Sequence, residues 1–318
     1  MDRDILIAVE HVSRDYDRRR AVDDISFTVQ RGEILGFLGP NGAGKTTTMH
    51  MICGVLAPTA GTISIAGHDI VEQPKQAKSC IGFLPEQPPL YPDLTVDQYL
   101  AYCGHLRGIA RGELAAAMNN SRERCGVQDV AGRLIGNLSK GYQQRVGIAQ
   151  AIIHSPELVI LDEPTVGLDP HQIVEIRQLI SELGDDHSVI LSTHILSEVQ
   201  STCDRVLIIH QGHLILDASL DSLAADSSSR GFTAALRQPP APEELAAVAG
   251  VVDVQPVGEK RFRIASDGAA QTPERFAEAA VRGGWGLFEL VPEVSTLEET
   301  FLRLTRGVDP PDNLDNAA

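Results

Sequence analysis

Residues 39–48 read GPNGAGKTTT, and this stretch decides the fold of the first part of the chain. An apolar run at residues 34–38 precedes it, and we expect a helix from Lys45 to about Leu56. The pattern G-x-x-x-x-G-K-T between a strand and a helix is typical of a loop whose backbone N–H groups surround phosphate oxygens. The helix adds the positive end of its dipole. The stretch therefore predicts a phosphate-binding site in an α/β fold.

The side chains of this loop suit a nucleoside triphosphate bound together with Mg²⁺. Lys45 would place a point charge beside the β- and γ-phosphates, and the Thr46 hydroxyl is suited to ligate the metal ion. A glycine-rich turn without a ligand is the alternative, which the flanking strand and helix disfavour. The residues expected to contact the nucleotide here are Gly39, Pro40, Asn41, Gly42, Ala43, Gly44, Lys45, Thr46 and Thr47.

Two carboxylates follow a second apolar run, LVIL at residues 158–161. Asp162 and Glu163 stand at the carboxyl end of this expected strand, where open α/β sheets bind their ligands. We expect Asp162 to orient Mg²⁺ through a coordinated water, and Glu163 to orient or deprotonate the attacking water. A solvated strand end with a capping acid is the alternative. His194 ends a third apolar strand and predicts a γ-phosphate contact, against the alternative of a structural histidine.

Composition limits the classes of protein that the chain can be. Its 318 residues carry a net charge of −16, which argues against a broad nucleic-acid-binding face because phosphate contacts need clustered Lys and Arg. The five cysteines are scattered, without a Cys-x-x-Cys pair, so they indicate a reducing cytoplasm rather than a disulfide framework or a zinc site. No apolar run approaches eighteen residues, so we expect no membrane-spanning helix.

Alternating strands and helices predict one α/β nucleotide-binding domain over residues 1–217, with a mainly parallel sheet covered on both faces. The alternation is interrupted by mostly helical segments, which predict a helical subdomain at about residues 87–156.

A composition shift at ADSSSRG, residues 225–231, marks the start of a second pattern. The order β-α-β-β-α-β predicts a small ferredoxin-like α+β domain over residues 218–308. We expect a final helix in residues 295–307 and a disordered tail at residues 309–318.

Taken together and in order, these motifs resemble those of the ATP-binding cassette (ABC) ATPases. GPNGAGKTT looks like the Walker A motif, LVILDE like Walker B, GLDP like the D-loop and STH like the switch histidine. LSKGYQQR, residues 138–145, lies where the signature motif of that family belongs. The resemblance covers residues 1 to about 217.

The resemblance implies a head-to-tail homodimer with two ATP molecules at its interface. Ser139 and Gly141 of one subunit would face the γ-phosphate held by the other, and a helix starting at Ser139 would present free N–H groups to that anion. A simple helix N-cap is the alternative for Ser139. Asp169 would link the two sites, and Tyr16 would stack on adenine, although by itself it is an ordinary tyrosine.

Three positions depart from the family pattern. The signature motif has Lys140 in place of a glycine and Tyr142 in place of a glutamine, and Lys140 adds a positive charge that would favour the phosphate. The glutamine of the Q-loop aligns with Glu86, and Gln87 follows it. A carboxylate at that position can bind Mg²⁺ or water, and which of the two residues serves is left open. These departures and the C-terminal domain look like the branch of multidrug-export and gliding-motility-associated ATPase subunits.

The leading hypothesis is an ATP-hydrolysing subunit of a membrane transporter of the export type. ATP binding would close the dimer, hydrolysis would reopen it, and a separate integral membrane permease would convert the motion into transport. The chain would then lie peripherally at the cytoplasmic face of the inner or plasma membrane. One alternative is a soluble ABC ATPase that acts on a macromolecule such as DNA or the ribosome. Such proteins usually carry two cassettes, a long coiled-coil insertion or zinc-binding cysteines, and the sequence shows none of these patterns. A nucleotide-gated regulator that barely hydrolyses is another.

Overall fold

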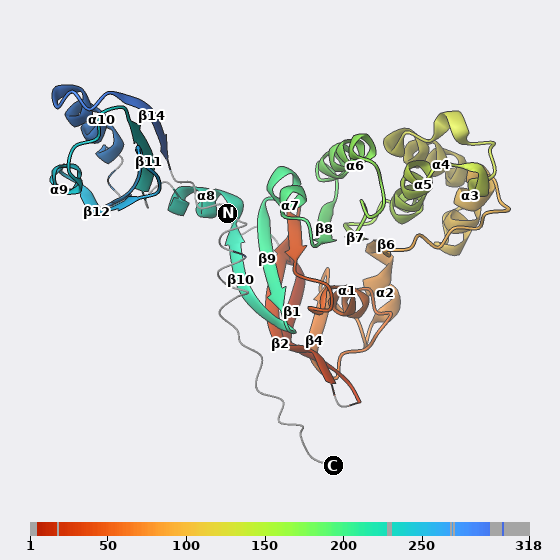
Figure 1. Ribbon diagram of the computed structural model, residues 1–318. Coiled ribbons are helices and arrows are strands. Elements are labelled where there is room, and N and C mark those ends of the chain that lie inside the picture. The colour runs from red at the N-terminus through yellow and green to blue at the C-terminus, as the bar shows by residue number, and fades with distance from the viewer. Residues whose placement is uncertain are drawn as a thin grey trace, which may run out of the picture. The chain divides into compact units, whose positions relative to one another are not determined.

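The computed structural model describes residues 5–17, 19–227, 231–267, 269, 271–292 and 301. Its internal contacts divide the chain into two units, Met1–Ala218 and Ser219–Ala318 (Figure 1). The helix expected within residues 295–307 lies outside the described residues except for Phe301, and so does the whole tail at residues 309–318.

A six-stranded sheet with the order β10-β9-β3-β8-β7-β6 forms the centre of the first unit. β9, β3, β8, β7 and β6 pair in parallel, so the carboxyl ends of β3, β6, β7 and β8 meet at one edge. This edge carries the phosphate loop, both carboxylates and the switch histidine. The strands are β3 Ile34–Leu38, β6 Ile81–Leu84, β7 Leu158–Asp162, β8 Ser188–Thr193, β9 Arg205–His210 and β10 His213–Ser219.

The central strands are apolar throughout because both faces of the sheet are covered. Along β7, Leu158 and Ile160 belong to one hydrophobic core, whereas Val159 and Leu161 belong to the other. Successive side chains of a strand point to opposite faces, so alternate residues serve different cores. The continuous apolar run predicted such a strand.

An antiparallel sheet with the order β2-β1-β4-β5 covers one face of the parallel sheet. The rings of Phe27 on β2 and Phe37 on β3 lie 5.9 Å apart between the two sheets. Tyr16 is the last residue of β1, at the edge of this sheet. The strands are β1 Ile5–Tyr16, β2 Arg19–Gln30, β4 Ala60–Ile65 and β5 His68–Asp69.

The helix after the phosphate loop, α1, extends over Lys45–Ile52 and is shorter than expected. Gly54 has a φ of 62°, and the N–H groups of Val55 and Leu56 both donate to the His50 carbonyl oxygen. This is the left-handed glycine ending common to many helices. The sequence prediction of an end near Leu56 was wrong because it overlooked this glycine.

Helices cover the other face of the parallel sheet and form the inserted helical segment (Figure 1). The insertion begins with a capping box, in which Thr95 and Gln98 each accept a hydrogen bond from the other's backbone N–H. Its helices are α3 Val96–Leu106, α4 Arg111–Cys125 and α5 Lys140–Ile152, with the short 3₁₀ turns η1 Gln128–Val130 and η2 Ile135–Asn137 between the last two. The remaining helices of this unit are α2 Pro74–Ser79, α6 Pro170–Leu183 and α7 Leu196–Thr202.

The second unit contains a four-stranded antiparallel sheet with the order β12-β13-β11-β14. Phe276 packs against Phe232 and against Trp285, the single tryptophan of the chain. After α8 Leu220–Ser227, the elements are β11 Gly231–Leu236, α9 Pro242–Ala246, β12 Val251–Pro256, β13 Arg261–Ser266, α10 Thr272–Arg282 and β14 Leu287–Pro292. This order is the split βαβ arrangement. The predicted fold class, an α/β unit with a helical insertion followed by a ferredoxin-like unit, is confirmed.

Candidate functional site

The loop between β3 and α1 forms a cradle for an anion. Gly42 and Gly44 have φ angles of 79° and 112°, where only glycine is free of strain. A Cβ on Gly39 would lie 2.4 Å from the carbonyl oxygen of Ile209. α1 begins without a side-chain cap, so the N–H groups of its first turn have no partner within the helix and face the loop.

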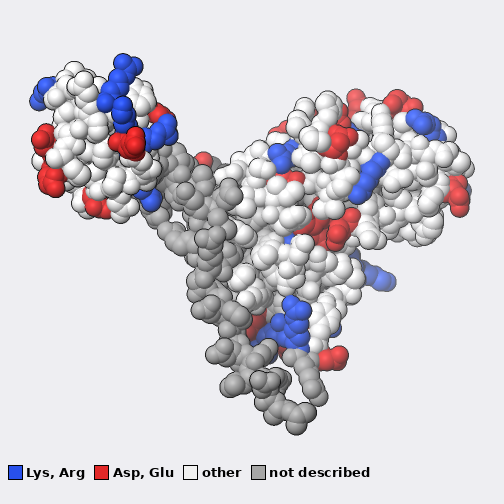
Figure 2. Space-filling model, viewed as in Figure 1, with Lys and Arg blue, Asp and Glu red and all other residues white. Residues whose placement is uncertain are grey.

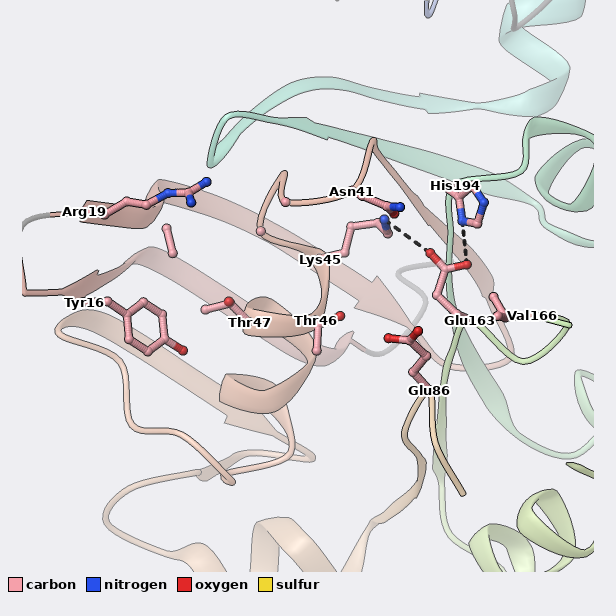
Figure 3. A pocket seen from close by; sticks show the side chains of 13 residues that line it. Tyr16, Arg19, Asn41, Lys45, Thr46, Thr47, Glu86, Glu163, Val166 and His194 are labelled. Carbon is pink, nitrogen blue, oxygen red and sulfur yellow. Dashed lines mark hydrogen bonds and ion pairs between the residues drawn. The ribbon is translucent and has the colours of Figure 1, made fainter. Parts of the chain in front are cut away.

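A cavity of about 700 Å³ opens beside this cradle (Figure 3). The predicted site residues that line it are Tyr16, Asn41, Gly42, Gly44, Lys45, Thr46, Thr47, Glu86, Glu163 and His194. Arg19, Ala21 and Val166 also line it and were not predicted. Pro40 and Ala43 line a neighbouring cavity of about 430 Å³.

Lys45 and Glu163 form a buried ion pair at the bottom of the cavity (Figure 3). The Lys45 ammonium lies 3.3 Å from Glu163 Oε1 and donates to the carbonyl oxygen of Gly39 at 2.9 Å. The two side chains are only 6% and 7% exposed. The ion pair holds the Lys45 ammonium beside the cradle. A phosphate entering the cavity would therefore meet the lysine and the Glu163 carboxylate together.

Glu163 also contacts the switch histidine. A hydrogen bond of 2.8 Å joins Nδ1 of His194 to Oε2 of Glu163. Glu163 has a φ of 50°, a left-handed conformation that is uncommon for a residue with a side chain. Such strain persists only where the surrounding structure enforces it, and it is found often at functional sites.

Asp162 carries an unused acceptor. Its Oδ1 accepts a hydrogen bond of 2.7 Å from Ser192, whereas its Oδ2 is buried and has no partner in the part of the chain that the structure describes. A buried carboxylate oxygen without a partner is unfavourable. It fits a water molecule held by a metal ion, as predicted for Asp162, and the Thr46 hydroxyl lining the cavity fits a direct ligand.

The outer end of the cavity is aromatic and basic. Tyr16 is 43% exposed, and the Arg14 guanidinium lies over its ring, 4.9 Å from the ring centre. One ring face is therefore occupied, and the other is available for a base. Arg19 lines this cavity and the neighbouring one. The sequence places it in a run of three arginines, which does not show which one faces the site.

The Q-loop alternatives lie at different places. Glu86 lines the nucleotide cavity, whereas Gln87 does not. Both residues line an adjacent cavity of about 360 Å³, together with Lys140 and Gln144. The position of Glu86 favours it as the residue that meets the nucleotide.

Ser139 and Gly141 do not line the nucleotide cavity of their own chain. Ser139 is the N-cap of α5, where its hydroxyl accepts from the Tyr142 N–H at 3.4 Å. A Cβ on Gly141 would lie 2.8 Å from the end of the Gln172 side chain of α6, which would have to move to make room for it. Asp169 caps α6 in the same way, accepting from the Gln172 N–H at 2.9 Å.

The two unusual residues of the signature stretch have contacts within their own chain. The Tyr142 hydroxyl donates to Asp129 at 3.0 Å, which ties α5 to η1 and raises the pKa of this tyrosine. The Lys140 ammonium lies so close to Gly167 that a Cβ there would be 2.0 Å from it. Lys140 is thus directed toward the D-loop of its own subunit.

The cradle, the cavity and the carboxylates at the ends of parallel strands define a P-loop nucleotide-binding protein. The family described as ABC transporter matches residues 22–166. The ABC transporter ATP-binding protein NatA of Bacillus subtilis is 42% identical over 206 residues, which are 64% of this chain and 84% of that protein. The Nod factor export ATP-binding protein I of Burkholderia lata is 33% identical over 302 residues, covering 94% and 96% of the two chains.

A solved structure of cbiO1 from Clostridium perfringens, part of the ABC transporter complex cbiONQ, has a TM-score of 0.65. The two sequences are 28% identical, and the match covers 70% of this chain and 92% of the cbiO1 chain. The chain therefore belongs to the ABC transporter family, as an ATP-binding subunit, and it is an ATPase. Among the described residues, no helix combines the length and the apolar character needed to cross a membrane.

Proposed function

We propose that the chain is the ATPase of an export-type transporter and acts as a head-to-tail homodimer. The observation that carries this proposal is the incomplete phosphate site. Ser139 and Gly141 lie outside the cavity that holds the phosphate loop, so in one chain alone the γ-phosphate would lack any contact with them. A second copy would present the N-terminus of α5 there, because the free N–H groups and the dipole of a helix N-terminus attract an anion.

Each lining residue then has a role in hydrolysis. Lys45 and the first turn of α1 hold the phosphates, and Tyr16 stacks on the adenine with its open face. Glu163 orients the attacking water and takes up its proton, and His194 holds that carboxylate through the 2.8 Å hydrogen bond. Asp169 and the D-loop would connect this site to the one in the partner subunit.

The remaining ligands suit Mg²⁺, which would neutralise charge on the β- and γ-phosphates. The Thr46 hydroxyl would bind it directly, and Asp162 would hold one of its waters through the unpaired Oδ2. Glu86 would contribute from the Q-loop side of the cavity.

We further propose that an integral membrane permease binds beside the Q-loop and that the chain lies at the cytoplasmic face of the membrane. Tyr91 and Tyr102 are 51% and 44% exposed, and their rings pack edge to face 5.7 Å apart near this loop. The cbiO1 relative is part of a transporter complex, and the Nod factor relative is an export protein by name. These two relatives support a membrane partner and the export direction.

The surface charge also favours a protein partner over a nucleic acid. On the face seen in Figure 2, the described Lys and Arg side chains stand in small separate groups among Asp and Glu. Nucleic-acid binding relies on clustered cations. In this proposal residues 1–217 are the nucleotide-binding domain, with residues 87–156 as its helical subdomain, and residues 218–308 are an accessory domain.

The dimer is tested by sedimentation of the full-length protein with and without ATP and Mg²⁺. In the Glu163→Gln background, where hydrolysis is blocked, we expect ATP to convert monomers to dimers. Adding Ser139→Arg should abolish the dimer and leave ATP binding by the monomer intact, while Ser79→Arg, on the exposed face of α2, should change neither. Loss of monomer ATP binding in the Ser139 variant would refute the assignment of this serine.

The membrane partner is tested by purifying the chain under mild detergent from its own cells. An integral membrane protein should co-purify and should be lost when Tyr91 and Tyr102 are both replaced by serine. Association with ribosomes or DNA in its place would support the macromolecule-directed alternative.

A further inference from the structure

A fully buried carboxylate lies behind the catalytic pair and belongs to none of the motifs above. Glu198, in the first turn of α7, is 0% exposed. A charge or polar group in the interior is stable only where hydrogen bonds compensate for the lost water. The two oxygens of Glu198 therefore need partners, and the identity of these partners indicates its purpose.

Both partners are threonines next to the reacting groups. The Thr165 hydroxyl donates to Oε1 of Glu198, and the Thr193 hydroxyl donates to Oε2 at 2.7 Å. Arg177 Nη2 forms an ion pair with Oε1 at 3.9 Å, which is beyond hydrogen-bond distance. The two threonines are 3% and 0% exposed, so the whole cluster is shielded from water.

Together with the Glu163–His194 pair, the cluster forms a closed ring of covalent links and hydrogen bonds. Thr165 follows Glu163 after Pro164, whose fixed φ makes the link stiff. Thr193 directly precedes His194. On the cavity side the ring is closed by the hydrogen bond between His194 and Glu163, and on the buried side by Glu198.

The ring helps to hold the strained backbone conformation of Glu163. A φ of 50° has to be enforced by neighbouring contacts. The N–H of Glu163 donates to the Ser192 carbonyl oxygen at 2.8 Å, which fixes one side of the residue. The hydrogen bond from Thr165 to Glu198 fixes the other side.

We propose that Glu198 is a positioning residue for ATP hydrolysis, which sets the separation of Glu163 and His194 through Thr165 and Thr193. The inference rests on the roles proposed above for Glu163 and His194. Glu198 does not line the nucleotide cavity, so its effect falls on the chemical step and not on ATP binding.

The test is steady-state ATP hydrolysis by the full-length protein. Glu198→Ala should lower kcat on the order of 10²-fold, because small displacements of reacting groups have effects of that size. KM for ATP should stay within about twofold, since uniform binding is unchanged. Gln200→Ala, on the exposed side of the same helix, is the control and should match the wild type.

Conservative variants separate positioning from a general loss of structure. Glu198→Gln should recover to within about fivefold of the wild-type kcat, because a threonine hydroxyl can donate to the amide oxygen or accept from the amide nitrogen. If Glu198→Ala does not fold, two variants of Thr193 replace it in the test. Thr193→Val should have a low kcat, and Thr193→Ser should have a kcat near that of the wild type. A folded Glu198→Gln protein as slow as the alanine variant would overturn the inference.

A double-mutant cycle completes the test. In a His194→Ala background, Glu198→Ala should cost less than it does in the wild type, because coupled residues are not additive. Equal losses in both backgrounds, or a raised KM with unchanged kcat, would show that Glu198 acts elsewhere. If Glu163→Gln hydrolyses ATP as fast as the wild type, the proposed role of Glu163 is wrong. If Glu163→Gln is inactive but Glu198→Ala is fully active, only the inference about Glu198 is wrong.

Discussion

The parallel sheet of the first unit and the antiparallel sheet of the second use strands of similar length and bury them differently. Every residue of β7 and β8 is buried, whereas β12 has no buried residue and β13 alternates near its start. Arg261 on β13 and Glu289 on β14 form an ion pair on strands of the second sheet. In the five parallel strands of the first sheet the ionisable groups stand at the strand ends, as Asp162 and Glu163 do.

This difference explains where the chemistry lies. A sheet covered on both faces has no room for polar side chains along its strands, so they collect where parallel strands end together. A sheet with one open face can place charges along its exposed strands, as on β12 and β13, and they meet water rather than a substrate. The following expectations test that contrast.

The largest effect is expected at a strand end of the first sheet. Glu163→Gln should lower kcat by at least about 10²-fold, because the carboxylate that takes up the proton is lost. ATP should bind a few-fold more tightly, since the substitution removes a negative charge beside the phosphates and releases Lys45. Single-turnover hydrolysis and equilibrium binding of ATP measure the two effects.

The matched control is a glutamate on a strand of the second sheet. Glu289→Gln should leave both hydrolysis and ATP binding unchanged. A comparable loss of kcat in this variant would mean that the contrast between the two sheets does not describe the chemistry.

A smaller effect, on stability, is expected when one valine in each sheet is replaced by alanine. Val159→Ala on β7, where the valine is 0% exposed, should lower the free energy of unfolding by about 2 kcal/mol. Val252→Ala on β12, where the valine is 68% exposed, should change it by less than about 0.5 kcal/mol. Urea unfolding followed by circular dichroism gives both values, and equal losses would contradict the burial argument.

The smallest effect concerns pH. Burial, aided by Arg107, lowers the pKa of His154 to about 4, below its ordinary 6.5. The unfolded chain therefore binds this proton more readily, so the first unit loses stability as pH falls from about 6.5 toward 4. Between pH 7 and pH 5 the loss should be about 1 kcal/mol, and His154→Gln should reduce it.

The second unit provides the internal comparison for this pH effect. All ten histidines precede residue 219, so none lies in the second unit. Hydrogen bonds from the Ala269 N–H and the Thr272 hydroxyl lower the pKa of Asp267 below its usual 3.8, so stability from this group is lost only at still lower pH. Thermal unfolding of the second unit should be the same at pH 7 and pH 5, and a shift equal to that of the first unit would contradict the assignment to His154.

Features that depend on a short continuous stretch could be predicted from the sequence. The phosphate loop needs its glycines and the start of a helix within ten residues, and the carboxylates follow their strand directly. The fold class followed from the alternation of apolar strands with amphipathic helices, and the comparisons confirm it. The individual roles given to the site residues stay predictions.

Features that depend on contacts between distant segments could not be predicted. Glu198 reaches Thr165 across a separation of 33 residues, and only the packing of α7 against the sheet brings them together. The contact of Lys140 with Gly167 and the hydrogen bond of Tyr142 to Asp129 arise in the same way. Glu86 and its neighbour Gln87 both line the adjacent cavity, but only Glu86 also lines the nucleotide cavity, and this depends on the path of the loop rather than on its composition.

The position of Trp285 gives the intact chain a built-in optical label. This residue is 9% exposed in the core of the second unit, and no other tryptophan exists in the sequence. Emission excited at the red edge of protein absorbance therefore comes from the second unit alone. The melting of the second unit can be followed in the intact chain, without cutting the protein or attaching a dye.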